Sequence, residues 1–307
     1  MAIDKLFHLV YAENILTLKG VAMKFPEWKW EHVQRGLLWI ALPLLLGILA
    51  ASAIPQPVVG VIRLNDAIYS YSAGELLAQI EYARTHPEVK AVVLALDSPG
   101  GTVVDTEAVY MELERLRAEK PVVASVNGMA ASGAYYLAVG TDYIYAKPTS
   151  EVGNVGVIGY LPPTPFIYED LISTGPYKLW GSPRDAYLRE IDAIKSVFYE
   201  AVSLGRGDAL KVGPETILRG QLWMGAEAVN KGIIDEIGTE NDAIQKAADM
   251  AHLWRYEAVD LYALAGLQPD YSGLFFQTDS NGVSLPYPSE PGLYLLYIPS
   301  LPAAAQP

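Results

Sequence analysis

The sequence predicts an α/β fold in which helices cover a parallel sheet, and two observations lead to this prediction. From Pro55 onward, stretches with strand character alternate with stretches of helical periodicity. One strand-like stretch contains the continuous apolar run Val92–Leu96, which is typical of a strand buried on both faces of a parallel sheet. Right-handed crossovers between such strands would place the helices on the faces of the sheet.

Each element of this prediction has its own signal in the chain. The predicted strands are Val58–Leu64, Val89–Leu96, Pro121–Val126 and Asp142–Ala146. Apolar residues recur at helical spacing in the predicted helices Ser72–His86 and Thr106–Lys120, a third helix is expected to begin within Ala130–Val139, and residues 186–205 and 225–252 are again largely helical.

A long uncharged run precedes this body. Gly36–Ile54 contains no charged residue, and as a helix its 19 residues would span roughly 28 Å, close to the hydrocarbon thickness of a bilayer. Tryptophans cluster near its start, and Arg35 precedes it, so the positive-inside rule predicts a cytoplasmic N-terminus and an extracytoplasmic body. Two alternatives are a cleaved signal peptide ending near Ala51–Ala53 and a soluble helix.

Composition excludes several classes of function. With 22 basic and 35 acidic residues the net charge is −13, which argues against nucleic-acid binding. The chain has no cysteine and only four histidines, none of them between residues 87 and 251. Thiolate nucleophiles, thiolate metal sites and a histidine-based triad in that stretch are therefore excluded.

Three short motifs carry chemistry. Asp97-Ser98-Pro99-Gly100-Gly101 follows one buried strand, and its glycines allow backbone N–H groups to point into a cleft. Ser132 lies among small residues after the next strand, where it could act as a nucleophile. Lys178 lies in Gly175-Pro176-Tyr177-Lys178, and a desolvated lysine can replace histidine as the base. Taken singly, each motif could instead be an ordinary turn, a close helix packing or a solvated loop.

Together these motifs resemble the signal peptide peptidase family, membrane-bound Ser–Lys proteases with the ClpP/crotonase-like fold. The matching segments run from about Val58 to His252: DSPGG at Asp97–Gly101, MAASGAYY at Met129–Tyr136, the lysine element at Gly175–Lys178, and GAEAVNKGIIDEIG at Gly225–Gly238. The resemblance covers about two-thirds of the chain. With the uncharged run and the change of composition after Ala258, it divides the chain into a cytoplasmic leader (residues 1–35), a transmembrane helix (36–54), a catalytic domain (55–257) and a Tyr/Pro-rich tail (258–307) that is either an extended arm or disordered.

The resemblance also implies roles for single residues. Ser132 would attack the scissile carbonyl, and Lys178 would take and return its proton. Backbone N–H groups near Gly100 or Gly101, with Gly133, would hold the oxyanion. Asn154 stands where the family has a serine that orients the lysine, and its amide oxygen can accept a hydrogen bond from the lysine amine.

The resemblance predicts a serine endopeptidase in the cell (inner) membrane that cuts hydrophobic peptides such as cleaved signal peptides. It implies a homo-oligomeric ring and neither cofactor nor metal nor nucleic acid. The altered position Asn154 and the proline-rich segment Leu161–Thr174 support an alternative, a catalytically impaired scaffold or peptide-binding protein. An acyl-CoA enzyme on the related crotonase fold is a third hypothesis, disfavoured by the acidic body.

Overall fold

A computed structural model describes residues 30–52, 56–159, 172–179, 181–268, 277–278, 284–285 and 293–296. Contacts divide the chain into two units, Met1–Pro55 and Gln56–Pro307. Most of the predicted leader and of the segment Leu161–Thr174 lies outside the described residues.

The first unit contains one helix, α2, among its described residues. It spans Trp30–Ser52, includes Pro43, and exposes its large apolar side chains between Leu37 and Leu49. Across the described part of the chain, no helix reaches the combination of length and apolarity that a bilayer crossing requires. The transmembrane helix predicted at Gly36–Ile54 is therefore not confirmed.

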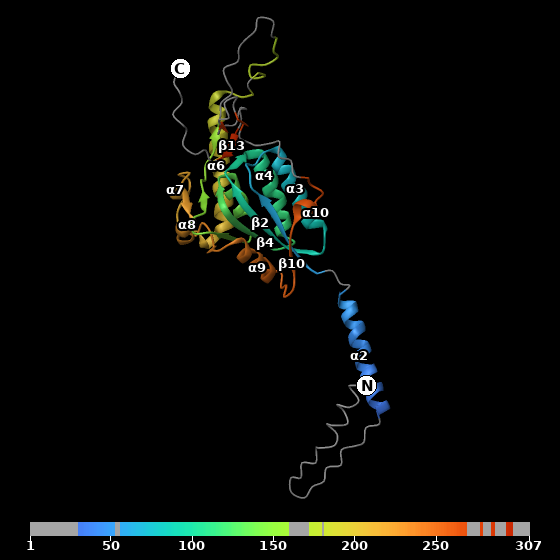
Figure 1. The fold of residues 1–307 in the computed structure, drawn as a ribbon. Helices are drawn as coiled ribbons and strands as arrows, with labels where there is room; N and C mark the ends of the chain where they lie inside the picture. The colour runs from blue at the N-terminus through green and yellow to red at the C-terminus, as the bar shows by residue number, and fades with distance from the viewer. Residues whose placement is uncertain are drawn as a thin grey trace. The chain divides into compact units, whose positions relative to one another are not determined.

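The second unit is built on a mostly parallel sheet (Figure 1). Its path is β10-β1-β2-β4-β5-β9, and all of these neighbours run parallel. The bounds are β1 Val58–Leu64, β2 Val89–Ser98, β4 Val122–Ala131, β5 Tyr143–Ala146, β9 Glu236–Ile237 and β10 Glu257–Asp260. Two further strands extend it, β6 Glu151–Gly153 parallel to β4 and β8 Leu222–Met224 antiparallel to β6. The sheet is thus parallel except at the β6–β8 pair, which the sequence did not predict.

Helices cover both faces of this sheet, and the alternation of side chains along β2 explains why. Val92, Leu94 and Leu96 enter one hydrophobic core, while Val93 and Ala95 enter another. The larger core is shared with α3 Ser70–Thr85, α4 Val103–Arg117, α5 Gly133–Val139 and α6 Arg184–Arg206, and the smaller with α9 Glu240–Met250. Short helices complete the fold: η1 Gly207–Ala209, α7 Pro214–Ile217, α8 Gly225–Lys231 and α10 Leu261–Leu264.

A second, three-stranded sheet contains a piece of the tail. β3 Gly100–Thr102 and β7 Ile158–Gly159 both pair with β13 Leu293–Leu296, antiparallel, in the order β3-β13-β7. β11 Gln277–Thr278 and β12 Ser284–Leu285 form a separate antiparallel pair. The tail therefore contributes β13 to the body of the second unit, next to one of the chemical motifs.

The α/β class is confirmed, but the predicted end of the strand before Ser132 is wrong. The predicted strand Pro121–Val126 stops short of β4, which continues through Ala131, while α5 begins at Gly133, within the predicted range Ala130–Val139. The extension pairs Met129, Ala130 and Ala131 with β6, a contact between segments some twenty residues apart that local pattern does not reveal. Ser132 is consequently the junction between a strand and a helix.

Candidate active site

The two glycine- and serine-bearing loops meet because they follow adjacent parallel strands. β2 and β4 are neighbours, and Ser98 on β2 pairs with Ala130 on β4. A Cβ atom built on Gly100 would lie 2.6 Å from the Gly133 nitrogen, so the two backbones are in direct contact. The structure thus brings Ser132, Gly100, Gly101 and Gly133 together at the carboxyl end of the sheet, where α/β proteins place their sites.

Ser132 has a backbone conformation that side-chain-bearing residues rarely adopt. Its φ is 53° and its ψ is −118°, and such a residue costs on the order of 1–3 kcal/mol. Two hydrogen bonds hold it: its N–H donates to the Gly153 carbonyl oxygen at 2.8 Å, and its own carbonyl oxygen accepts from Tyr136 N–H at 2.9 Å. Strand pairing and the first turn of α5 therefore enforce the sharp turn at this serine.

In the glycine-containing strand β3, one backbone N–H group faces the site, while the N–H groups of the two neighbouring residues form hydrogen bonds elsewhere. Ile68 N–H donates to the Gly100 carbonyl oxygen, and Thr102 N–H donates to the Ile68 carbonyl oxygen, both at 2.8 Å. Gly100 N–H donates to Ser98 Oγ at 3.2 Å. Because backbone groups alternate sides along a strand, the N–H of Gly101 faces away from Ile68. Between the two donors that the sequence left open, the geometry favours Gly101.

Ser98 is a residue whose contribution sequence reasoning missed. Its side chain is buried, and its hydroxyl oxygen accepts a hydrogen bond from the N–H of Gly100 at the turn that leads into β3. The hydroxyl of Thr102 accepts from Asp105 N–H at 3.2 Å and so caps α4 directly after the glycines. The sequence motif includes Ser98, but the hydrogen-bond partner of its hydroxyl depends on the folded turn.

The surroundings of the serine are apolar. All of α5 is buried, and burial raises the pKa of Tyr136 to about 12, so its phenol stays neutral at physiological pH. The Tyr136 ring packs against Tyr110 and Phe198, with centroid distances of 4.6 and 5.0 Å. A water-poor environment of this kind strengthens the interaction of backbone N–H groups with a developing negative charge.

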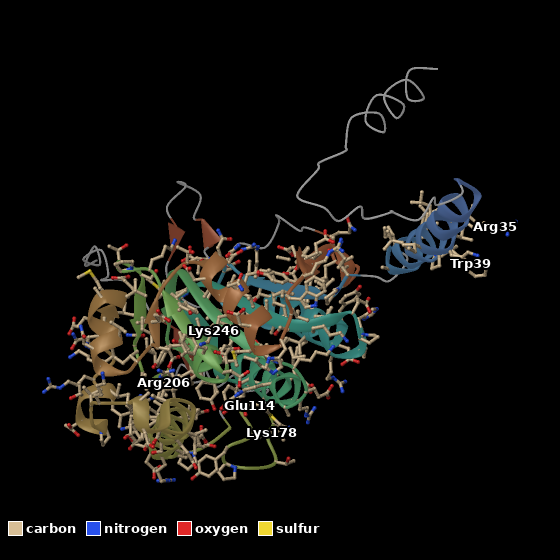
Figure 2. The ribbon with its side chains drawn as sticks, turned by 90° about the horizontal axis from the view of Figure 1, so that it is seen from below. Arg35, Trp39, Glu114, Lys178, Arg206 and Lys246 are labelled. Carbon is tan, nitrogen blue, oxygen red and sulfur yellow. The ribbon has the colours of Figure 1, made fainter. Side chains whose placement is uncertain are left out.

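Lys178 forms no hydrogen bond with Ser132 among the described residues. It lies in an exposed turn preceding α6, whereas Ser132 is only 1% exposed. Figure 2 shows it at the periphery of this unit. Among the described residues, its side chain makes no ion pair or hydrogen bond.

Asn154 lies close to the serine along the β4–β6 pair, immediately after Gly153, which pairs with Ala131. Its φ is 57°, and its N–H donates to the Gln221 carbonyl oxygen at 2.8 Å. Its Nδ2 donates to the Gly220 carbonyl oxygen at 2.7 Å. The side-chain amide thus binds the loop before β8 rather than Lys178.

Comparison with known proteins gives the family. The peptidase family S49 profile matches residues 114–253, and the Clp protease profile matches residues 58–152. A candidate protease of Synechocystis sp., slr0021, is 33% identical over 198 residues, which covers 59% of this chain and 71% of that protein. The chain belongs to peptidase family S49.

One relative is considerably longer than this chain. Protease 4 of Salmonella typhi is 34% identical over 200 residues, which covers 60% of this chain and 32% of that protein. The chain therefore spans about a third of the length of this relative. A solved membrane-bound stomatin-specific protease, a lysine-to-alanine mutant in complex with a substrate peptide, has a TM-score of 0.50 and 17% identity, covering 71% of this chain and 95% of the other. That similarity supports the ClpP-like fold of this S49 chain.

Proposed function

We propose that this chain is a serine endopeptidase in which Ser132 is the nucleophile. The observation that carries the proposal is the convergence of three backbone features: the sharp turn at Ser132, the N–H of Gly101 and the N–H of Gly133. A hydroxyl beside two preorganised N–H donors is the arrangement that acyl transfer requires. Membership of family S49 supports the same reaction.

In the proposed reaction, Ser132 Oγ forms a bond to the scissile carbonyl carbon, and the carbonyl oxygen becomes an oxyanion held by Gly101 and Gly133 N–H. Lys178, as a neutral amine, takes the hydroxyl proton and passes it to the leaving amine as the peptide C–N bond breaks. Water then attacks the acyl-enzyme and releases the acid, with Lys178 again moving the proton. Asn154 Oδ1 would orient the amine, since its Nδ2 is bound to Gly220.

This reaction requires Lys178 to leave its exposed position. Either the turn at residues 172–179 closes over Ser132, or a neighbouring copy in a homo-oligomeric ring supplies the lysine. Co-expression of Ser132→Ala chains with Lys178→Ala chains separates the two routes. Recovery of activity in mixed oligomers supports supply by a neighbour, whereas inactive mixtures support closure within one chain.

The proposed substrates are hydrophobic peptides such as cleaved signal peptides. The full chain in detergent, incubated with such a peptide, is expected to cleave it, and Ser132→Ala and Lys178→Ala are each expected to lower kcat at least about 10³-fold. Ser196→Ala and Lys195→Ala, which change exposed residues of α6, serve as matched controls. Equal activity of wild type and both site variants would mean that the dyad is wrong.

A non-catalytic peptide-binding protein is the second candidate, and the exposed position of Lys178 together with Asn154 favours it. Under this hypothesis the assembled wild-type chain binds the hydrophobic peptide and leaves it intact at every pH. A fluorophosphonate probe that labels wild type, but not Ser132→Ala, argues against it.

We also propose that α2 attaches the protein to a membrane. Its large apolar side chains, among them Leu38, Leu42 and Leu45, are at least half exposed. A continuous apolar surface of this kind is typical of a site that contacts a membrane or another protein. The full chain is expected to remain in the membrane fraction after carbonate extraction, and the double variant Leu42→Glu/Leu45→Glu to move into the supernatant. Wild-type protein in the supernatant would contradict membrane attachment.

A further inference from the structure

The strand β13 of the tail lies between the two strands that border the site. It pairs antiparallel with β3, which carries Gly100 and Gly101, and on its other side with β7. Figure 1 shows β13, in red, against the body of the second unit. An extended segment that adds to free strand edges in this way is held as a bound peptide is held in β-augmentation.

The register places one carbonyl group of the tail at the proposed oxyanion donors. Leu295 pairs with Gly101, whose N–H faces β13. A Cβ atom built on Gly100 would lie 2.0 Å from the Leu295 carbonyl oxygen, and one built on Gly133 would lie 3.1 Å from the same oxygen and 3.3 Å from Gly101 N. The Leu295 oxygen therefore lies among Gly100, Gly101 and Gly133, where the carbonyl of a substrate would bind.

The tail segment is also well buried. Leu295 is 1% exposed and belongs to the larger hydrophobic core, and Tyr294 is 7% exposed. Fully burying a leucine side chain contributes about 1.5–3 kcal/mol. Because β13 is tethered to the same chain, its local concentration at the site is on the order of millimolar. A free peptide must displace it to reach Ser132.

We propose that Leu293–Leu296 is an intramolecular occupant of the peptide-binding site, with Leu295 in the place of the residue before the scissile bond, and that it competes with substrate. This inference rests on the proposed function, since it names a regulator of the same site. The tail is held without being cut while Lys178 lies in its exposed turn. Release of β13 opens the site to peptides.

A disulfide between β3 and β13 tests this directly, because the chain has no cysteine of its own. Thr102 and Tyr294 are direct partners, and they form a non-hydrogen-bonded pair because the N–H of Thr102 is bound to Ile68. The Cα atoms of such pairs are about 4.5 Å apart, within the range that a disulfide spans. The variant is Thr102→Cys/Tyr294→Cys in the full chain, and each single variant is the control for the loss of the α4 cap or of the tyrosine.

Oxidation is expected to give a cross-linked species that migrates as a monomer under non-reducing conditions. Peptidase activity is expected to fall at least tenfold on oxidation and to return with reductant, while the single variants do not change. A cross-linked chain that cleaves free peptide as fast as the reduced one overturns the inference. A disulfide-linked dimer overturns the assignment of β13 to its own chain.

A binding measurement keeps this test independent of catalysis. In a Ser132→Ala background, a fluorescent peptide with the sequence of residues 290–299 is expected to bind Leu295→Glu at least tenfold more tightly than unchanged tail, and Leu264→Glu, an exposed leucine of α10, no more tightly. Equal affinity in all three contradicts tail competition. A failure of the chains that retain Ser132 to hydrolyse peptide, with this affinity difference present in the Ser132→Ala background, refutes the proposed function and leaves the tail as occupant of the site.

Discussion

The N–H of Ser132 donates to the carbonyl oxygen of Gly153 at 2.8 Å, so the edge of β6 fixes the backbone of the proposed nucleophile. Gly153 itself has a φ of 114°, which side-chain-bearing residues rarely adopt. A Cβ atom at this position would lie 2.7 Å from the Trp223 ring, which is buried. Ser132 therefore depends on a glycine that lies outside its own motif.

The first prediction concerns this glycine. Gly153→Ala is expected to destabilise the protein by about 1–3 kcal/mol, from backbone strain and overlap with Trp223, and to lower kcat where the variant is still folded. Thermal unfolding and peptide cleavage below the transition check the two effects. Gly156→Ala, where a Cβ atom meets nothing within 4 Å, is the control and should resemble wild type. An unaltered Gly153→Ala variant would show that β6 does not constrain Ser132.

The second prediction concerns Gly133, the other proposed oxyanion donor. A Cβ atom here would lie 2.7 Å from Thr106 Oγ1 and 3.3 Å from Gly101 N, so this crowded backbone must adjust. Gly133→Ala is expected to lower kcat about 10²-fold, because one misplaced oxyanion donor costs roughly that much, with a smaller change in KM. Steady-state kinetics measure the split. Gly74→Ala, on an open helix surface, should leave kcat unchanged; a pure KM effect at Gly133 would speak against oxyanion binding.

The third prediction concerns the ion pair between the buried Arg206 and the partly buried Asp235. The guanidinium binds both carboxylate oxygens at 2.7 and 2.8 Å, and its Nε donates to the Gly232 carbonyl oxygen at 2.9 Å. Arg206→Met is expected to cost about 3 kcal/mol in urea unfolding, since the partly buried Asp235 loses both hydrogen bonds from the guanidinium and keeps only the one from Ile144 N–H. Arg189→Met, which breaks an exposed pair with Asp185, should cost less than about 1 kcal/mol. A similar loss in the free energy of unfolding for both variants would mean that burial does not determine how much an ion pair contributes to stability.

The fourth prediction is a pH dependence at Glu240. Its carboxylate accepts from the Arg63 guanidinium at 2.6 and 2.7 Å and from Asn127 Nδ2 at 2.9 Å. Hydrogen bonds from Arg63 hold the pKa of Glu240 below its ordinary value of 4.5, so the unfolded state binds the proton more tightly. The stabilisation is therefore present above pH 4.5 and is lost as the pH falls through the lowered pKa.

Glu240→Gln is expected to be less stable than wild type at pH 7 and to approach it at pH 3, as measured by urea midpoints at both values. Glu215→Gln is the control, because Glu215 forms no ion pair with any described residue. A stability gap for Glu240→Gln that stays constant from pH 7 to pH 3 would exclude the linkage.

Local pattern predicted the strands of this fold well, and its failures have physical causes. The predicted strand Val58–Leu64 has the same first and last residues as β1, because an apolar run bounded by proline and polar residues is a local signal. The end of β4 was missed, because Met129–Ala131 joins the sheet only through β6, and no residue near Ser132 reveals that partner. The boundary at Ser132 followed from this long-range pairing.

The site was predicted unevenly for a similar reason. The glycines and Ser132 could be named because each follows an apolar strand, and adjacent parallel strands end at the same edge. Ser98 and Leu295 could not be assigned a role, because the first depends on the geometry of one turn and the second on pairing across almost two hundred residues. The roles of Lys178 and Asn154 remain predictions.

The pairing of β13 with β3 and β7 has a consequence for selectivity. Backbone N–H and C=O groups are the same in every residue except proline. This pairing therefore recognises an extended backbone and does not depend on the amino-acid sequence. Folded proteins cover their strand edges or place charged residues on them, so they would not bind in this way. Extended segments that have lost their neighbouring strands would bind. The side chain of Leu295 is almost completely buried at this position. Choice among substrates would therefore rest on how far they are unfolded, with one apolar residue as a further filter.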